Sequence, residues 1–191
     1  MTRIGIILGS TRPGRSGEAV ARWVLDIAGR RDDAEYELID IAEQALPHFD
    51  EPIPPMAGAY THPHTLAWAE RVQRLDGFVF VTPEYNHSVP GALKNAIDFL
   101  FAEWGDKAAG FVGYGPTGAT RAVEHLRLIM SELKVATVRA QATLTFATDF
   151  ADHATFRPAE ESAATVELVL DQVVTWTEAL EPVRRKAGQD R

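Results

Sequence analysis

Hydrophobic residues along the chain fall into two alternating patterns. Short, unbroken apolar runs are typical of strands that are covered on both faces of a sheet. The sequence predicts five such strands, at residues 4–8, 36–39, 78–81, 111–114 and within 135–146. Apolar residues at three- and four-residue spacing fill the intervals and indicate helices with one buried face. We place these helices at about 20–28, 65–75, 90–101, 119–133 and 158–180.

Five strands that alternate with five helices predict an α/β fold, with a parallel sheet and helices on both faces. Right-handed crossovers leave few topologies, and the commonest for five strands is the flavodoxin-like order 2-1-3-4-5. We expect a single domain over residues 1–183 and a polar C-terminal tail over 184–191. Ligands of such sheets bind at the carboxyl ends of the strands, near the switch between strands one and three. The loops after those two strands are therefore the expected site.

The helical period also names residues expected to be buried, and one connection is unusually long. Leu66, Leu128 and Trp176 fall on the apolar stripes of three predicted helices, so we expect them to be buried. Residues 46–63 hold five prolines and little periodicity, which predicts a loop. Long loops in compact domains are often functional.

Composition narrows the classes of function. The 191 residues include 19 Lys or Arg and 27 Asp or Glu, for a formal net charge of -8, which argues against a nucleic-acid-binding surface. The chain has no cysteine, which excludes disulfides, thiolate nucleophiles and cysteine-ligated metal centres. No apolar run approaches the roughly 20 residues of a membrane span. We therefore expect a cytoplasmic protein without a membrane partner.

The loop at residues 9–17 is rich in groups that bind anions. It carries three glycines, the hydroxyls of Ser10, Thr11 and Ser16, and the guanidinium groups of Arg12 and Arg15, directly before a helix. A helix N-terminus presents free backbone N–H groups and a partial positive charge, which together favour a phosphate. The alternative is a helix start capped by Ser16, with both arginines solvated. The clustering of these groups favours a phosphate cradle.

The loop at residues 82–91 follows the third predicted strand and is stiffened by two prolines. Between them lie the carboxylate of Glu84, the ring of Tyr85, the amide of Asn86 and the imidazole of His87. A flat heteroaromatic ring would fit against such a loop, with backbone N–H groups facing its polar edge and Tyr85 packed beside it. A strand-to-helix connection with Asx turns and caps explains the same residues equally well.

A longer stretch around this loop resembles a known family. Pro-Glu-Tyr-Asn at 83–86, followed by Ser-Val-Pro-Gly-Ala-Leu-Lys-Asn-Ala-Ile-Asp at 88–98, is similar to the signature of the NAD(P)H-dependent FMN reductases. That family includes flavodoxin-like chromate, quinone and azo-dye reductases. Gly-Ser-Thr-Arg at 9–12 with Ser16 is similar to the family's phosphate loop, and the residues from Trp104 to Arg127 are also family-like. The resemblance covers roughly residues 3–145.

The resemblance implies an enzyme that passes electrons from NADPH or NADH, through bound FMN, to a small-molecule acceptor. The residues that it places around the cofactor lie in three loops. They are Ser10, Thr11, Arg12, Arg15 and Ser16 at the phosphate, Pro83, Glu84, Tyr85 and Asn86 at the ring edge, and Gly115, Pro116, Thr117 and Gly118 beside the ring. His87 and Tyr114 are expected in the acceptor pocket. The redox chemistry belongs to the flavin, so no residue is assigned as catalytic and no metal is expected.

The resemblance also implies a homodimer or homotetramer with the flavin near the subunit interface. This chain departs from the family at residues 117–120, Thr-Gly-Ala-Thr, where paired glycines are common. Pro116 and Thr117 are bulkier than the usual residues beside the flavin.

Three other motifs carry less weight. Residues 113–118 match the dinucleotide pattern G-x-G-x-x-G, but they follow the fourth strand and lack the acidic residue expected downstream. His62 and His64 suggest a metal, although a solvated loop explains them better. Glu84 and Asp98 are candidates for an acid–base pair, but a loop-fixing role for Glu84 and an ion pair of Asp98 with Lys94 are favoured.

Two other functions remain open at this point. One is an FMN-binding electron carrier or redox sensor with little turnover of its own. The other is a domain that binds a phosphate-sugar or nucleotide without flavin.

Overall fold

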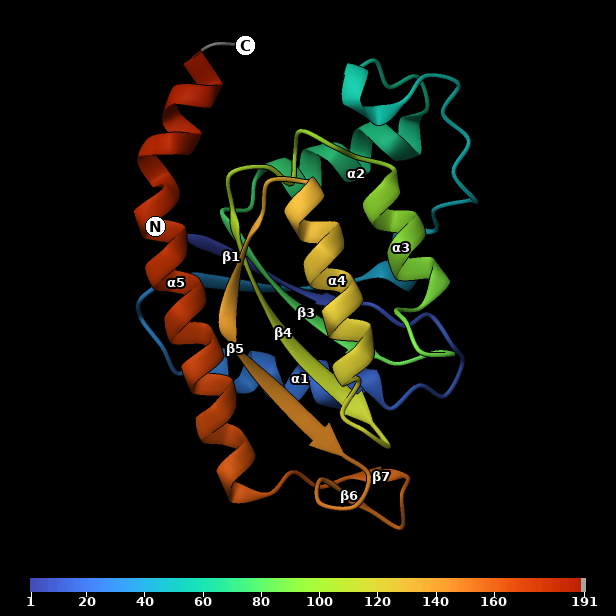
Figure 1. The fold of residues 1–191 in the computed structure, drawn as a ribbon, viewed down its shortest axis with the longest axis vertical. Helices are drawn as coiled ribbons and strands as arrows, with labels where there is room; N and C mark the ends of the chain where they lie inside the picture. Colours follow the sequence, from blue (N-terminus) through green and yellow to red (C-terminus); the bar gives the residue numbers. More distant parts are fainter. Residues whose placement is uncertain (190–191) are drawn as a thin grey trace.

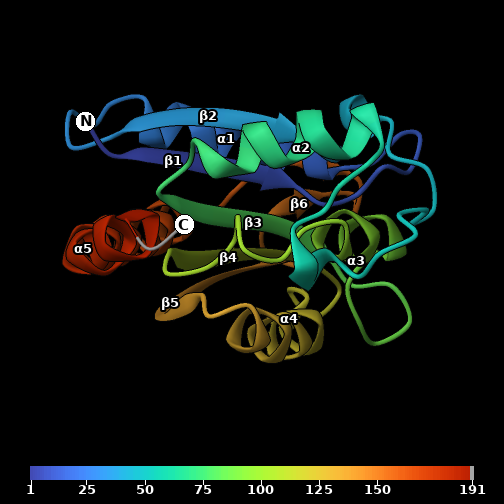
Figure 2. The same ribbon diagram turned by 90° about the horizontal axis from the view of Figure 1, so that it is seen from above.

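The computed structural model describes residues 1–189 of the chain, and five parallel strands form its central sheet (Figure 1). The strands are β1 (Arg3–Leu8), β2 (Glu35–Asp40), β3 (Gly77–Pro83), β4 (Ala108–Gly115) and β5 (Ala136–Thr145). Their order is β2-β1-β3-β4-β5, which Figure 2 shows from one edge of the sheet to the other. The flavodoxin-like order expected from the sequence is therefore confirmed.

The helices cover both faces of the sheet and bury two separate cores. One core packs beneath α1 (Gly17–Ala28) and α5 (Glu160–Gln189). The other packs beneath α2 (Pro63–Gln73), α3 (Gly91–Asp98) and α4 (Thr120–Glu132). Short 3-10 helices, η1 (Ile41–Gln44) and η2 (Pro55–Ala57), interrupt the connection between β2 and α2.

Strand β3 shows how one run of apolar residues serves both cores. Phe78 and Phe80 point into the core under α2 to α4, whereas Val79 and Val81 point into the core under α1 and α5. All four side chains are fully buried. Each contributes about 1.5–3 kcal/mol relative to an exposed position, so the central strand fixes the position of the loop that follows it.

The pairing of β4 with β5 contains a bulge, and side chains from both faces of the sheet form hydrogen bonds with the backbone groups around it. The register shifts between Ala109 and Phe111. Arg127 on α4 donates from Nη1 to the carbonyl of Val138 at 2.7 Å, and the N–H of Ala140 donates to Oε1 of Gln172 on α5 at 2.8 Å. The backbone groups released by the bulge are thus paired rather than left buried without a partner.

The last helix is longer than the sequence pattern predicts. Residues 184–189, which we expected in a polar tail, continue α5 beyond Pro182. Arg184 explains part of this, because its Nη1 donates to the Thr177 carbonyl at 2.8 Å and its Nη2 lies 3.5 Å from Asp76 Oδ1. Residues 190–191 of the expected tail lie outside the described residues, and the extent of the domain stays a prediction.

Three apolar residues assigned to buried helix faces are instead on the surface. The exposed fractions are 52% for Leu66, 73% for Leu128 and 50% for Trp176. The structure also contains a hairpin that the sequence pattern does not predict, formed by β6 (Phe150–Ala151) and β7 (Thr155–Phe156). Its strands have two residues each, too short to give a period.

Within residues 1–189, none of the helices combines the length and the apolar character that crossing a membrane requires.

Candidate functional site

The loop after β1 begins with a buried hydroxyl. Ser10 is fully buried, and its Oγ lies 2.8 Å from the hydroxyl of Tyr85 in the loop after β3. The N–H of Arg12 donates to the same Oγ at 3.4 Å. Ser10 therefore joins the two loops that the sequence singled out, at the carboxyl ends of adjacent strands β1 and β3.

The N-terminus of α1 is open to a ligand. Ser16 occupies the N-cap position, but its side chain makes no hydrogen bond to the helix. Gly14 has φ 68°, a conformation that favours glycine, and a Cβ there would meet nothing within 4 Å. The expected alternative, a helix start capped by the Ser16 side chain, is therefore not what forms. The hydroxyl and the first N–H groups of α1 remain available to an anion.

The two arginines of this loop differ in their surroundings. Arg15 is largely buried and forms an ion pair with Asp40 at the carboxyl end of β2. Arg12 is exposed, and no ion pair to it is found among the described residues. The expectation that both arginines face a phosphate thus applies most simply to Arg12, while Arg15 holds the end of β2 against the loop.

The loop after β3 closes on itself as a two-residue turn. Tyr85 and Ser88 exchange backbone hydrogen bonds of 2.9 and 3.2 Å. The two central residues, Asn86 and His87, have φ of 49° and 75°, in the left-handed region that such turns require. Tyr85, Asn86 and His87 are exposed, so the tip of the turn faces solvent beside the phosphate loop.

Glu84 fixes the base of this turn to α4. Its carboxylate forms an ion pair with Arg121, and the side chain is 7% exposed. The bond from Arg121 lowers the pKa of Glu84 most, and backbone N–H groups of Ala122 and Arg121 at the start of α4 lower it further against the opposing effect of burial. Asp98 pairs with Lys94 at 2.6 Å. Both contacts match the structural roles favoured from the sequence over an acid–base pair.

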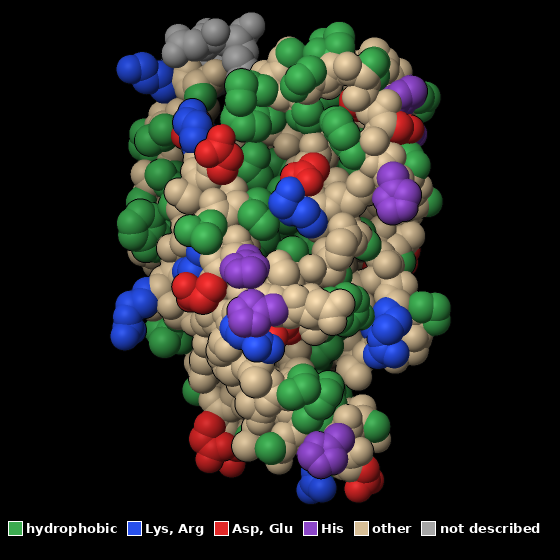
Figure 3. All heavy atoms as spheres, turned by 45° about the vertical axis from the view of Figure 1, so that its right-hand side comes forward, with side chains coloured by type: hydrophobic (Ala, Val, Ile, Leu, Met, Phe, Trp, Pro, Cys, Tyr) green, Lys and Arg blue, Asp and Glu red, His purple; other side chains and the backbone are tan. Residues whose placement is uncertain are grey.

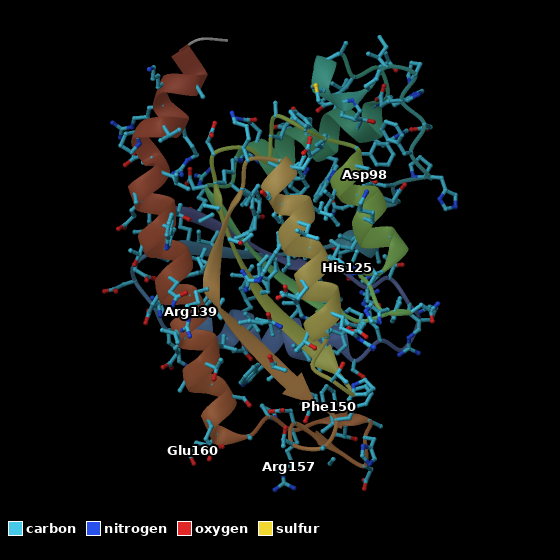
Figure 4. The ribbon with its side chains drawn as sticks, in the orientation of Figure 1. Asp98, His125, Arg139, Phe150, Arg157 and Glu160 are labelled. Carbon is cyan, nitrogen blue, oxygen red and sulfur yellow. The ribbon has the colours of Figure 1, made fainter. Side chains whose placement is uncertain are left out.

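Tyr114 at the end of β4 lies beneath the phosphate loop instead of lining an open pocket. It is 4% exposed, and a Cβ on Gly17 would lie 2.3 Å from its hydroxyl. Burial is the main cause that raises its pKa well above the usual range. Its expected place in an acceptor pocket stays a prediction. His87 is exposed, and its ring centroid lies 5.9 Å from that of His125 on α4, which Figure 4 labels.

The loop after β4 forms a tight turn at the same edge of the sheet. Gly115 and Gly118 are buried, with φ of 136° and 60°, and the N–H of Gly118 donates to the Gly115 carbonyl at 3.1 Å. A Cβ on Gly118 would lie 2.0 Å from Thr143 Cγ2. Pro116 and Thr117 form the exposed tip. The glycines are thus required by backbone conformation and by close packing, whereas the two bulkier residues point outward.

These groups fit FMN. The uncapped N-terminus of α1, the free Ser16 hydroxyl and exposed Arg12 are donors suited to a phosphate. The turn at residues 85–88 lies beside them through the Ser10–Tyr85 contact.

On the side that carries α3 and α4, Figure 3 shows charged groups of both signs scattered among histidines, without a large patch of one sign on that face.

Comparisons with known proteins identify the family. The sequence profile of the NADPH-dependent FMN reductases matches residues 2–149, most of the chain. The chain belongs to the NADPH-dependent FMN reductase family. It is an FMN-dependent oxidoreductase that takes its electrons from NAD(P)H and passes them through the bound flavin to a small acceptor. The resemblance inferred from the two loops is therefore confirmed.

Individual relatives of this reductase cover between two thirds and nearly all of its length. A NAD(P)H-dependent FMN reductase of Schizosaccharomyces pombe is 36% identical over 98% of this chain and 88% of its own. A quinone reductase of Escherichia coli K12 is 38% identical over 65% of this chain and 66% of its own. Among solved structures, the FerB NAD(P)H:(acceptor) oxidoreductase of Paracoccus denitrificans aligns with a TM-score of 0.73, at 25% identity, over 94% of this chain and 98% of that one.

The structure adds two residues to the site that the sequence reasoning did not single out. Asn95 on α3 accepts from the Phe49 N–H at 2.9 Å and donates to the Pro47 carbonyl at 2.7 Å, which holds the loop after η1. Asparagine is a poor helix former, so its place inside α3 was a signal of a tertiary role. His125 Nδ1 lies 2.9 Å from Ser88 Oγ, and nothing in the sequence spacing indicates that contact.

Proposed function

We propose that this FMN reductase binds the FMN phosphate at the N-terminus of α1 and the flavin ring against the turn at residues 85–88, and that its acceptor is a quinone. The observation that carries the proposal is the open start of α1, where the Ser16 side chain caps nothing, joined to the second loop by the Ser10–Tyr85 contact. An open helix N-terminus costs stability unless a ligand or water satisfies it.

Each loop has a separate task in this proposal. Arg12, Ser16 and Thr11 would donate to the phosphate, and Arg15 would support them through Asp40. Backbone N–H groups of Glu84 and Asn86 would face the polar edge of the ring, with Pro83 and Tyr85 packed beside it, because the Tyr85 N–H already donates to the Ser88 carbonyl. Gly115, Pro116, Thr117 and Gly118 would flank the ring. When bound, FMN accepts two electrons from NAD(P)H and returns them to the acceptor. The chain's own part is to bind, orient and partly desolvate the reactants.

Several relatives support a quinone as the acceptor. The Escherichia coli relative is named a quinone reductase, and a relative from a Burkholderia species, 29% identical over 70% of this chain, is named a 2-hydroxy-1,4-benzoquinone reductase. A two-electron transfer suits a quinone because it yields the hydroquinone directly. By the same family relationship we propose a homodimer or homotetramer that works in the cytoplasm.

The phosphate site is tested by the double variant Arg12→Ala with Ser16→Ala. We expect FMN affinity to fall by on the order of 1.5–3 kcal/mol for each charge-assisted bond lost. The measurement is a fluorescence titration of FMN into the protein. Arg22→Ala is the control, because Arg22 lies on the exposed side of α1 and pairs with Glu18. Equal FMN affinity in the double variant and the control would overturn the assignment.

A further inference from the structure

The turn at residues 85–88 has a backbone conformation that needs support from outside the turn. Its two central residues, Asn86 and His87, lie in the left-handed region, at φ 49° and 75°. Two-residue turns of this kind usually carry glycine at the second central position, where this chain has His87. Residues with a side chain are uncommon at positive φ, and they remain there where surrounding contacts hold them.

Helix α4 supplies contacts on both sides of this turn. Ser88 Oγ lies 2.9 Å from Nδ1 of His125, which Figure 4 labels. A histidine ring nitrogen can donate to a hydroxyl or accept from it, depending on the tautomer. Arg121, four residues earlier and thus on the same side of α4, forms the ion pair with Glu84 just before the turn. One side of α4 therefore fixes the chain at both ends of the turn.

The helix that carries His125 is itself firmly held. Arg127 on α4 donates from Nη1 to the Val138 carbonyl of β5 at 2.7 Å. The side of α4 that faces the sheet consists of fully buried residues, namely Ala122, Val123, Leu126 and Met130. A contact made from such a rigid element restricts the loop that it touches.

The bond between His125 and Ser88 has little to contribute to the stability of the whole fold. His125 is exposed and Ser88 is half-buried, so water can replace either partner when the bond breaks. Its effect is therefore local, on the backbone of the turn. Substitutions of His125 should leave the fold intact, which makes this effect measurable.

We propose that His125 is a positioning residue, which holds the turn through Ser88 so that the N–H groups of Glu84 and Asn86 keep facing the flavin. The proposal rests on the proposed function, which places the polar edge of the ring against this loop. Its new element is the assignment of a residue on α4, outside the cofactor loops, to the control of the flavin.

Holding the turn should favour the reduced state of FMN. Transfer of a hydride from NAD(P)H brings the ring two electrons and one proton, and NAD(P)+ leaves, so the ring gains one negative charge. Donors that are already in position when charge develops stabilise it more than donors that must first be ordered. His125 should therefore raise the reduction potential of bound FMN, because it keeps the Asn86 N–H in position.

Three substitutions separate the contact with Ser88 from the imidazole ring itself. His125→Ala removes the polar atom. His125→Asn keeps a polar atom as many bonds from Cβ as Nδ1 is, so it can still bond to Ser88. His125→Gln places its amide one bond farther out and is the matched control for an added amide. Ser131→Ala, at an exposed position in the last turn of α4, controls for a change elsewhere on this helix.

The main readout is the midpoint potential of FMN in the loaded protein, measured by anaerobic redox titration. We expect His125→Ala to weaken the binding of reduced FMN about ten-fold more than that of oxidised FMN, a fall of about 30 mV for a two-electron couple. His125→Gln should behave like His125→Ala. His125→Asn and Ser131→Ala should change the ratio of the two affinities less than about two-fold, or about 9 mV.

A second readout needs no flavin. The Ser88 N–H donates to the Tyr85 carbonyl at 3.2 Å, across the turn. Its hydrogen exchange, followed by NMR before FMN is added, should be faster in His125→Ala than in wild type and His125→Asn. Ser88→Ala should lower the potential as His125→Ala does, and the double variant should lower it no further, because both substitutions remove the same bond.

Two results would overturn the role of His125. One is an unchanged potential in His125→Ala. The other is the same potential in His125→Asn and His125→Gln, which would show that the contact with Ser88 is not the means. In both cases the protein still holds FMN, so the proposed function stands. Wild-type protein that retains no FMN would refute the proposed function, and this role with it.

Discussion

Single residues at the edge of the sheet decide whether the cofactor loops can approach one another. Gly17 is the clearest case, because it begins α1 directly over the Tyr114 hydroxyl. Ser10, which is fully buried, then bridges to Tyr85 across the gap between β1 and β3. The arrangement depends on the absence of one side chain and on the presence of one hydroxyl.

Replacing Gly17 with Ala tests this close approach. The new Cβ would lie 2.3 Å from the Tyr114 hydroxyl and 2.9 Å from Leu8 Cδ1, so backbone or ring must move. We expect a loss of about 1–3 kcal/mol in the free energy of unfolding, despite the higher helix propensity of alanine. Urea titration monitored by circular dichroism measures it. Adding Tyr114→Phe should recover part of the loss, and no recovery would show that the hydroxyl is not the obstacle.

Among the helices, α3 and α4 provide side chains that hold the loops around the site in place. Glu84 anchors the loop after β3 to the first turn of α4, and Asn95 anchors the loop after η1 to α3. Both helices begin at the same edge of the sheet as the cofactor loops. These two helices therefore hold the loops around the site as well as the core.

Asn95→Ala should loosen the segment at residues 47–49 without unfolding the sheet. Two hydrogen bonds are lost, at about 0.5–1.5 kcal/mol each. The Phe49 amide, which donates to Asn95 Oδ1, should exchange its hydrogen faster. Asn95→Asp keeps that acceptor and loses only the bond to the Pro47 carbonyl, so its Phe49 exchange should stay close to that of the wild type. Equal exchange in all three proteins would contradict the clamp.

Hydrophobic periodicity predicts the elements of this chain well, and the reason is visible in β3. Every residue of Gly77–Pro83 is buried, because helices cover both faces of the sheet. The strand therefore shows a nearly continuous run of apolar residues instead of an alternating pattern. The glycine- and proline-bearing loops after β1, β3 and β4 lie at one edge of the sheet, as the strand order predicts. Their contacts with the cofactor stay a prediction.

Other features were beyond the sequence pattern for physical reasons. Leu128 and Trp176 fit the helical spacing of apolar residues but face solvent. The spacing identifies the apolar face of a helix, but it does not show whether another element covers that face. The pairing of Arg15 with Asp40 joins the loop after β1 to the end of β2, across 25 positions of sequence. Asn95 can clamp the loop after η1 only because the fold brings Phe49, 46 residues earlier in the chain, next to α3.

For the whole molecule, buried carboxylates make stability depend on pH. Burial alone would raise the pKa of Glu51, but hydrogen bonds led by that of the His62 N–H outweigh it and lower the pKa to about 2, from an ordinary 4.5. Burial would also raise the pKa of Asp149. Hydrogen bonds from Ser162 and Thr148 outweigh that effect, so the pKa of Asp149 is lowered. Glu51 closes the connection between β2 and α2 onto Thr61 and His62, whereas Asp149 ties the end of β5 to the start of α5.

The sign of the effect follows from these directions. Because the folded-state pKa of Glu51 lies below its ordinary value, the carboxylate stabilises the fold above about pH 4.5 and loses that contribution as the pH falls toward 2. We expect the urea midpoint to drop between pH 5 and pH 3, and to drop less in Glu51→Gln than in wild type. Exposed Glu43→Gln is the control. A drop of equal size in all three proteins would show that Glu51 does not contribute.

One series of anaerobic absorption spectra tests most directly whether this chain carries FMN and passes electrons from NAD(P)H to a quinone. FMN is added to the purified protein, excess is removed by desalting, and NADPH or NADH and then a quinone are added in turn. We expect the protein to retain the flavin absorbance, a nicotinamide to bleach it, and the quinone to restore it. Retained flavin that no nicotinamide bleaches, or protein that holds no flavin after desalting, would show that the chain does not work as an FMN-dependent reductase.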